Sequence, residues 1–311
     1  MATYLDMLDQ LIRAGLQSVE AKQLRPHLRF VMSRQIDSGA FTDGRGGTSL
    51  AETDFAVRIA CLLEDDAARL LGAGEDCTGC FRRCGVTRPV AAYLARQATI
   101  PATLRECFHW LNLRRLLAAT EASVEIDSPE IAGRLLEWWD NGEDLLTVAN
   151  CFECLDLQIP SVGAKAEALL RRRRDDGGFG DMAATSQAVA FCALCGELPE
   201  DIVPGLIGFV AKCQRPAGGF APGPDGLADL PSTFAALLTL WTLQGAGAVD
   251  LVAAEEFIGG VALPTGGFGQ PPNIESTFHA LASLALLHQS NQAPAAGTIR
   301  CVGTGRAGLK H

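Results

Sequence analysis

Three cysteines stand close together in an irregular, glycine-containing segment. Cys77, Cys80 and Cys84 occur within the stretch EDCTGCFRRCGV. Thiolates at this spacing suit a zinc ion or an iron–sulfur cluster, although no fourth ligand is evident from the sequence. The alternative is a set of reduced thiols on a loop, so metal binding here is one of two hypotheses.

Carboxylates and one histidine form the second group of candidates. Glu52, Asp54, Asp229 and Glu275 each lie beside the predicted start of a helix, and His279 lies one turn inside the last of these helices. If the helix starts gather at one opening, paired carboxylates there are suited to general acid and base catalysis. Each carboxylate is also explained singly as a helix cap or as an acid stabilised by the helix N-terminus.

The helices that must position these residues belong to an internal repeat. A Gly-Gly-Phe turn, a polar loop and a threonine that opens an apolar helix recur in DDGGFGDMAATSQAVAFCAL, PAGGFAPGPDGLADLPSTFAALLTL and PTGGFGQPPNIESTFHALASLALL. An N-terminal copy keeps this order, and two fainter copies complete a set of six. The threonines recur every 38 to 50 residues, at Thr53, Thr103, Thr147, Thr185, Thr233 and Thr277.

Each repeat is predicted to be a pair of helices. The residues three, four and seven places after the clearest threonines are small or apolar, which puts them on one stripe of a helix. A second helical pattern precedes each turn. Because one helix pair cannot bury its apolar face alone, neighbouring repeats must stack. Glycine in the turn permits a sharp reversal with positive φ, and the phenylalanine plugs the junction.

The repeat also explains four other cysteines. Cys107 and Cys151 fall four residues after their threonines, and Cys154 and Cys192 fall seven residues after theirs. Alanine, valine and leucine fill these positions elsewhere, and a buried free cysteine behaves as a small hydrophobe. We therefore predict core packing for these four rather than metal binding.

Composition narrows the function classes. The 311 residues are 48% hydrophobic and 20% charged, which predicts a large core within one repeat domain. A net charge of -10 argues against a nucleic-acid partner, which needs a basic surface. No apolar run approaches the roughly 18 residues of a membrane span, and acids stand where a signal peptide has bases. We expect a cytoplasmic protein without a membrane span.

Three regions are predicted. Residues 1–20 form an N-terminal helix that either seals the repeat domain or meets a helical protein partner. Residues 21–290 hold the repeats, and residues 291–311 lack periodicity and form a loosely ordered tail. The apolar stripe of the N-terminal helix comprises Leu5, Leu8, Ile12, Leu16 and Val19.

The repeat resembles that of protein prenyltransferase β-subunits and, more loosely, that of squalene-type terpene cyclases. The resemblance rests on Gln35 with Gly39 and Phe41, on Gln214 with the Gly-Gly-Phe at 218–220, and on two further Gly-Gly-Phe turns. It implies an all-α fold, an α6/α6 toroid of six inner and six outer helices around a central cavity. It also implies an isoprenoid or other apolar ligand, which enters where the turns gather.

In that family a zinc ion activates the acceptor thiolate, held by an Asp and a Cys in the fifth repeat and a His in the sixth. The matching positions here are Asp229, Pro231 and Ser276, so two of the three ligands are missing. A zinc site of altered composition would use Asp229, Glu275 and His279.

The family's diphosphate-binding Arg and Lys correspond to Gly223 and Gly226, which carry no positive charge. Terpene cyclases instead use an Asp-x-Asp-Asp acid and aromatic walls. The stretch Glu64-Asp65-Asp66 lacks that spacing, and 6% aromatic residues provide little material for a wall.

Three hypotheses follow. The first is a catalytically altered or inactive toroid that binds an apolar ligand, with Glu52, Asp54 and Glu275 at the cavity mouth. The second is an active prenyltransferase or cyclase with Asp229 and His279 as catalytic residues. The third is a protein-interaction scaffold. A wide, open, apolar cavity favours the first hypothesis, and a filled centre favours the third.

Overall fold

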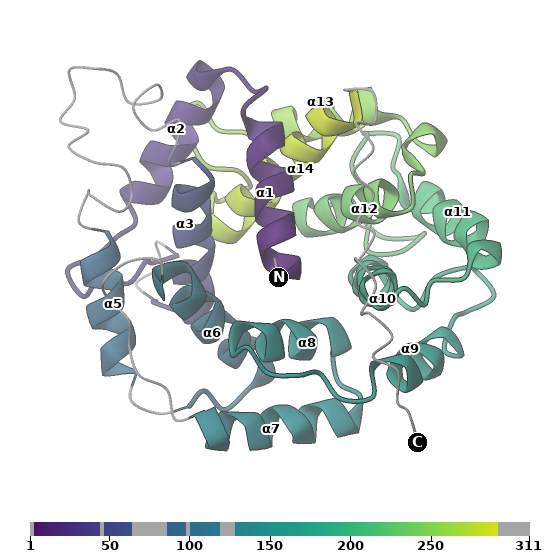
Figure 1. Cartoon of the computed structure of the whole chain (residues 1–311). Coiled ribbons are helices and arrows are strands. Elements are labelled where there is room, and N and C mark those ends of the chain that lie inside the picture. The colour runs from purple at the N-terminus through teal and green to yellow at the C-terminus, as the bar shows by residue number, and fades with distance from the viewer. Residues whose placement is uncertain (1–2, 44–46, 64–85, 98–99, 119–127, 292–311) are drawn as a thin grey trace.

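The computed structural model describes residues 3–43, 47–63, 86–97, 100–118 and 128–291, and within these ranges the chain forms two concentric rings of helices (Figure 1). The inner helices are α3 (Leu50–Leu62), α6 (Leu104–Ala118), α8 (Leu145–Cys154), α10 (Met182–Cys195), α12 (Leu230–Thr242) and α14 (Ile274–Asn291). The outer helices are α2 (Ala21–Met32), α5 (Thr87–Arg96), α7 (Ser128–Asn141), α9 (Val162–Leu170), α11 (Val203–Cys213) and α13 (Leu251–Gly260). Short 3-10 turns η2 (Glu200–Ile202) and η3 (Ala246–Ala248) lie beside α11 and α12.

The inner helices form a closed circle. Each packs against the next in the order α3, α6, α8, α10, α12 and α14, and α14 packs back against α3. The predicted all-α toroid is therefore confirmed. None of the helices in the described ranges is long and apolar enough to cross a lipid bilayer.

The repeated threonine joins the turn to the inner helix. The Thr233 hydroxyl accepts a hydrogen bond from the Phe220 N–H (3.0 Å) and donates one to the Asp229 carbonyl (2.6 Å). The hydroxyls of Thr53 and Thr277 likewise accept the N–H of the turn phenylalanine and donate to the carbonyl of the cap residue. The Thr185 hydroxyl accepts the N–H of its turn phenylalanine. One hydroxyl therefore satisfies the turn N–H and gives the cap carbonyl a second hydrogen bond, beside the one that this carbonyl accepts from the threonine N–H.

The second and third repeats depart from the predicted register. In the other repeats the threonine is the fourth residue after the helix N-cap, a place we name the anchor position. Thr103 instead caps α6, so the anchor position there is Cys107. Thr147 precedes the anchor position of α8, Val148, by one residue. The predicted equivalence of Thr103 and Thr147 with the other threonines was wrong, because these repeats lack the Gly-Gly-Phe turn that sets the register.

Glycine is required where each turn meets the next repeat. Gly266 has a φ of 96°, and a Cβ there would lie 2.0 Å from the carbonyl oxygen of Pro26 in α2. A Cβ on Gly39 would likewise lie 1.9 Å from the carbonyl oxygen of Pro89 in α5. Since Pro26 belongs to the first outer helix, the contact of Gly266 closes the ring between the last repeat and the first.

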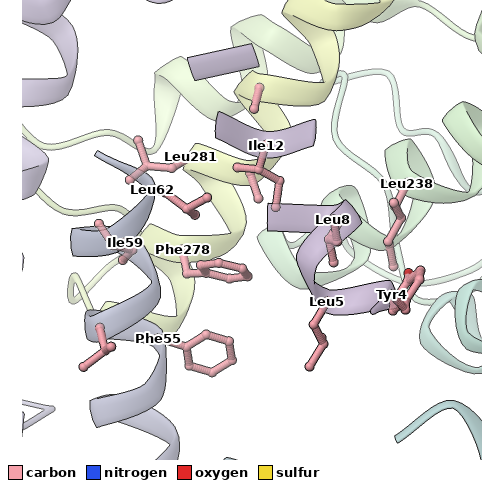
Figure 2. Packing of buried hydrophobic residues seen from close by; sticks show 14 of the residues in the cluster. Tyr4, Leu5, Leu8, Ile12, Phe55, Ile59, Leu62, Leu238, Phe278 and Leu281 are labelled. Atoms are coloured by element: carbon pink, nitrogen blue, oxygen red, sulfur yellow. The ribbon is translucent and has the colours of Figure 1, made fainter. Parts of the chain in front are cut away.

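An additional helix, α1 (Tyr4–Leu16), lies inside the ring (Figure 1). It packs mainly against α14 and also against α3. Leu5, Leu8 and Ile12 are buried and approach Phe278 and neighbouring side chains of α14 (Figure 2). The apolar stripe that was considered for a helical protein partner is therefore covered by the toroid itself.

α1 crosses the end of the ring that lies opposite the turns. Its hydrogen bonds reach Arg58 and Cys61 in α3, Arg115 in α6 and Glu153 in α8, all in the second halves of these helices. The inner helices begin at the turns, so the ring has a mouth on the turn side and a floor formed by α1.

The predicted core cysteines are confirmed. Cys107, Cys151 and Cys192 are buried, and the half-buried Cys154 packs against the same core. Cys77, Cys80 and Cys84 lie outside the described residues, as does most of the tail at 292–311.

Candidate functional site at the ring axis

In three inner helices the second residue after the anchor position points toward the ring axis. Phe55 of α3 shows this, because its ring centroid lies 5.4 Å from that of His109 in α6 and 5.6 Å from that of His279 in α14. The side chains at this position in three neighbouring inner helices therefore face one another. The same position holds Asn150 in α8, Ala235 in α12 and Gln187 in α10, whose amide binds Asp144.

Further aromatic side chains join this group. Phe234 of α12 lies 5.5 Å from His279, Phe278 lies 5.1 Å from Phe55, and Phe108 lies 5.3 Å from His109, between ring centroids. Phe108, Phe234 and His279 keep part of their surface exposed. Aromatic residues are only 6% of the chain, but the fold gathers these side chains from four helices. The two positions after the anchor are the sequence signal that identifies them.

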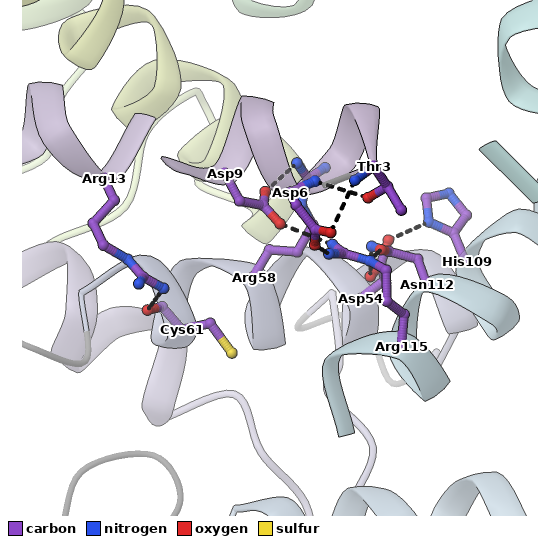
Figure 3. A network of polar contacts seen from close by, with 10 residues as sticks. All are labelled: Thr3, Asp6, Asp9, Arg13, Asp54, Arg58, Cys61, His109, Asn112 and Arg115. Atoms are coloured by element: carbon purple, nitrogen blue, oxygen red, sulfur yellow. Dashed lines mark hydrogen bonds and ion pairs between the residues drawn. The ribbon is translucent and has the colours of Figure 1, made fainter. Parts of the chain in front are cut away.

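Asp54 lies within the wall of the ring and not at its mouth. It is fully buried, with Oδ2 2.8 Å from His109 Nδ1 and Oδ1 accepting a hydrogen bond from Asn112 (2.7 Å) (Figure 3). Its carboxylate is thus held by two side chains of α6. Sequence reasoning missed His109 and Asn112, which the corrected register of α6 places beside the axis.

The same network continues to the floor. Asn112 accepts a hydrogen bond from Arg115 (3.0 Å), and Arg115 and Arg58 each bind Asp9 of α1 at 2.8 Å (Figure 3). Although burial opposes it, these two guanidinium groups hold the pKa of Asp9 below its usual value. α1 is therefore tied to the axial residues by charge as well as by apolar packing.

Two of the predicted mouth residues, Glu52 and Glu275, lie close to each other at the starts of α3 and α14. Glu275 pairs with Arg105 of α6 at 3.2 Å, and burial together with the charges of Glu275 and Asp43 raises the pKa of Glu52. Because α3 lies between α6 and α14, the Arg105–Glu275 pair spans the mouth in front of α3. Arg105 and Arg34 act against this rise in the pKa of Glu52, so three acids stand against two bases at this end of α3.

Asp229 and His279, the predicted catalytic residues, lie in different environments. The Asp229 carboxylate caps α12 by accepting the Ser232 N–H (2.6 Å). His279 faces the axis, where burial and the nearby charges of Arg58 and Arg105 lower its pKa to about 3. Among the described residues, no hydrogen bond or ion pair joins the two.

Three buried polar atoms around the axis have no hydrogen-bond partner in the described chain. They are Glu52 Oε2, Asn150 Oδ1 and His279 Nδ1. Buried polar atoms are usually paired, so such atoms at a potential site mark where a ligand's polar group would be stabilised. They come from three of the inner helices, α3, α8 and α14.

The positions that resemble the zinc ligands do not fit a zinc ion. The Asp229 carboxylate serves as a helix cap, Pro231 has no donor atom, and Ser276 offers only a hydroxyl. The described ranges also contain no group of three or more His, Cys, Asp or Glu placed to hold a metal.

Known proteins share this architecture. The family described as "Prenyltransferase alpha-alpha toroid domain" matches residues 1–196 and 147–303. A segment of 80 residues is 35% identical to "Protein farnesyltransferase subunit beta" of Pisum sativum. That segment makes up 24% of this chain and 19% of the pea protein, so the match spans about a fifth of the relative's length.

Proposed function

Since this chain belongs to the prenyltransferase alpha-alpha toroid family, we propose that it binds an isoprenoid or similar apolar molecule at the ring axis without carrying out zinc-dependent prenyl transfer. The observation that carries the proposal is the convergence of aromatic side chains from α3, α6, α12 and α14 on the axis. Partly exposed aromatic faces favour a branched, unsaturated hydrocarbon through dispersion and through removal of apolar surface from water.

The polar atoms around the aromatic surface indicate a neutral head group. Glu52 and Asn150 present acceptor oxygens without partners, and either one suits a hydroxyl donor. A diphosphate would face the carboxylates of Glu52, Glu275 and Asp43, and Arg105 and Arg34 offset only part of their charge. An isoprenoid alcohol therefore fits this site better than an isoprenoid diphosphate.

The floor limits how deep the ligand reaches. α1 fills the end of the ring opposite the mouth, with Leu5 and Ile12 almost completely buried. An apolar ligand therefore lies between α1 and the mouth, over the partly exposed Phe108 and Phe234, and does not pass through the ring.

Transfer chemistry lacks its usual groups at the matching positions. Pro231 and Ser276 replace two zinc ligands, and Gly223 and Gly226 replace the cations that would stabilise a leaving diphosphate. Binding without zinc-dependent transfer is the function that these residue types support.

Calorimetric titration with geraniol and with geranyl diphosphate tests this function. We expect geraniol to bind at least about tenfold more tightly than the diphosphate. Phe234→Ala should weaken geraniol binding by about tenfold or more, whereas Leu227→Ala, on an 89% exposed loop residue, should leave it unchanged. Stoichiometric zinc together with transfer of a geranyl group to a thiol would overturn the proposal.

A further inference from the structure

A cleft of about 360 Å³ lies between α8, α9 and α10. Its apolar lining includes Leu169, Phe179 and Phe191. In the ring order, the gap between α8 and α10 is opposite the gap between α14 and α3, where Glu52 and Glu275 lie. The cleft therefore lies across the ring from these two carboxylates, and its volume is in the range of small-molecule sites.

Short connections leave this cleft open. Only the three residues at 142–144 join α7 to α8, whereas residues 214–229 join α11 to α12. In the longer connection Pro222 accepts the Met182 N–H (2.7 Å), so the loop folds over the start of α10. The third repeat has no comparable loop to cover the gap between α8 and α10.

One wall of the cleft is positively charged. Arg172 and Arg174 follow the end of α9 and both line the cleft. Arg173, between them, lies on the other side, where a Cβ on Gly205 of α11 would be 3.2 Å from its Nη1. Within the described chain, neither Arg172 nor Arg174 forms an ion pair or a side-chain hydrogen bond, so both guanidinium groups have free donors.

The opposite wall is negatively charged. Asp144 lines the cleft, and its carboxylate is held by the Thr147 N–H (3.1 Å), the Thr147 hydroxyl (2.6 Å) and the Gln187 amide (2.7 Å). Glu143 beside it is exposed and has no ion-pair partner in the described part of the chain. One carboxylate of the cleft is thus held by hydrogen bonds, and the other carboxylate and both guanidinium groups are not. No ion pair among the described residues joins the two walls.

We propose that this cleft binds a small zwitterion of the α-amino acid class with an apolar side chain. Its carboxylate binds between Arg172 and Arg174, because guanidinium groups match a carboxylate with paired N–H donors. Its ammonium group lies toward Glu143 and Asp144, and its side chain packs on Leu169 and Phe179. This site does not depend on the axial ligand.

Charge complementarity selects this class over simpler ions. A lone anion would gain from the arginines but face the acids of α8, and a lone cation would meet the reverse arrangement. Only a ligand with both charges, separated by a short distance, is attracted to both walls.

Calorimetric titration of the full chain with L-phenylalanine tests the proposal. L-Phenylalaninamide lacks the carboxylate and N-acetyl-L-phenylalanine lacks the ammonium group, so both should bind about tenfold more weakly or worse. The double variant Arg172→Gln/Arg174→Gln should lose a similar factor, and Glu143→Gln should lose a smaller one. Arg173→Gln is the matched control and should bind as the unaltered protein does.

Three results would overturn the proposal. The first is no binding of L-phenylalanine at about 10 mM. The second is equal affinity for the amide. The third is binding of inorganic phosphate that Glu143→Gln strengthens, since this identifies an anion site.

All four side chains altered are exposed, and a far-ultraviolet circular dichroism spectrum verifies that each variant is folded. Geraniol should not displace L-phenylalanine, so the two sites fail or succeed independently.

Discussion

At the scale of single residues, one position per inner helix determines the chemistry of the axis. The second residue after the anchor is Phe55 in α3, His109 in α6, Asn150 in α8 and His279 in α14. The same helix position thus holds an apolar ring, a hydrogen-bonded imidazole, an amide and an imidazole without a hydrogen-bond partner. Changing one of these residues alters the site without altering the repeat that presents it.

His279 provides a pH-dependent test of this environment. Burial, with the permanent charges of Arg58 and Arg105, lowers its pKa to about 3 in the folded protein. In the unfolded chain His279 binds a proton near pH 6.5. The free energy of unfolding therefore keeps its full value above that pH and declines as the pH falls toward 3. His279→Gln should reduce the slope of unfolding free energy between pH 6 and 4 by up to about 1.4 kcal/mol per pH unit.

Urea unfolding at several pH values between 4 and 7 measures that slope. His27 also stays neutral, because burial lowers its pKa to about 4 and its Nδ1 accepts the Gly267 N–H (3.0 Å). It contributes equally to both proteins, so the difference between them isolates His279. Identical slopes in the two proteins would show that His279 accepts a proton as readily in the fold as in the unfolded chain.

At the scale of elements, α1 is held by one very close helix crossing and one charged network. Gly15 lies at the crossing with α14, where an added Cβ would be 2.2 Å from the Ala285 carbonyl oxygen. Near the middle of α1, Asp9 joins Arg58 and Arg115. The crossing allows close apolar packing, and the ion pairs orient the helix over the floor.

Gly15→Ala should therefore destabilise the protein. The contact is with backbone, which cannot rotate away, so α1 and α14 must separate and lose packing around Ile12. We expect a loss of about 1–3 kcal/mol in the free energy of unfolding measured with urea.

Gly133→Ala is the matched control. Gly133 is also helical, in α7, but an added Cβ there meets nothing within 4 Å. Better helix propensity should make that variant about 0.5–1 kcal/mol more stable. If Gly15→Ala were also stabilising, the close crossing of α1 and α14 would be disproved.

At the scale of the whole molecule, stability depends on closing the ring. The seam joins the last turn to the first outer helix through Gly266 and Pro26, and α14 to α3 through their side chains. Gly266→Ala should strain the left-handed backbone and also push the turn away from Pro26. We expect it to lower the free energy of unfolding and to increase amide hydrogen exchange in both α2 and α13, on the two sides of the seam.

Gly142→Ala separates these two effects. Gly142 also has positive φ, at 67°, but an added Cβ there meets nothing within 4 Å. Gly142→Ala should therefore lose only about 1–2 kcal/mol through backbone strain, with no increase in amide hydrogen exchange at the seam. Equal losses in the two variants would show that the seam contributes nothing beyond the glycine conformation.

The sequence alone determined much of this architecture. Helix pairs, the six repeats, the closed toroid and the core positions of Cys107, Cys151 and Cys192 were all predictable. These features are periodic or local, because a Gly-Gly-Phe turn and an apolar stripe act within one repeat. The prediction failed in register at Thr103 and Thr147, where the turn motif is absent and several helix starts fit the pattern equally well.

Only the tertiary structure decided what meets at the axis. The aromatic group around Phe55, the Asp54–His109 contact and the place of α1 inside the ring join residues from different repeats. Such contacts depend on which faces of separate helices turn toward one another, and no single repeat contains that information. The candidate carboxylates show the same limit. The sequence placed all four at helix starts and allowed for the cap that Asp229 forms, but it did not show that Asp54 is buried or that Glu275 pairs with Arg105.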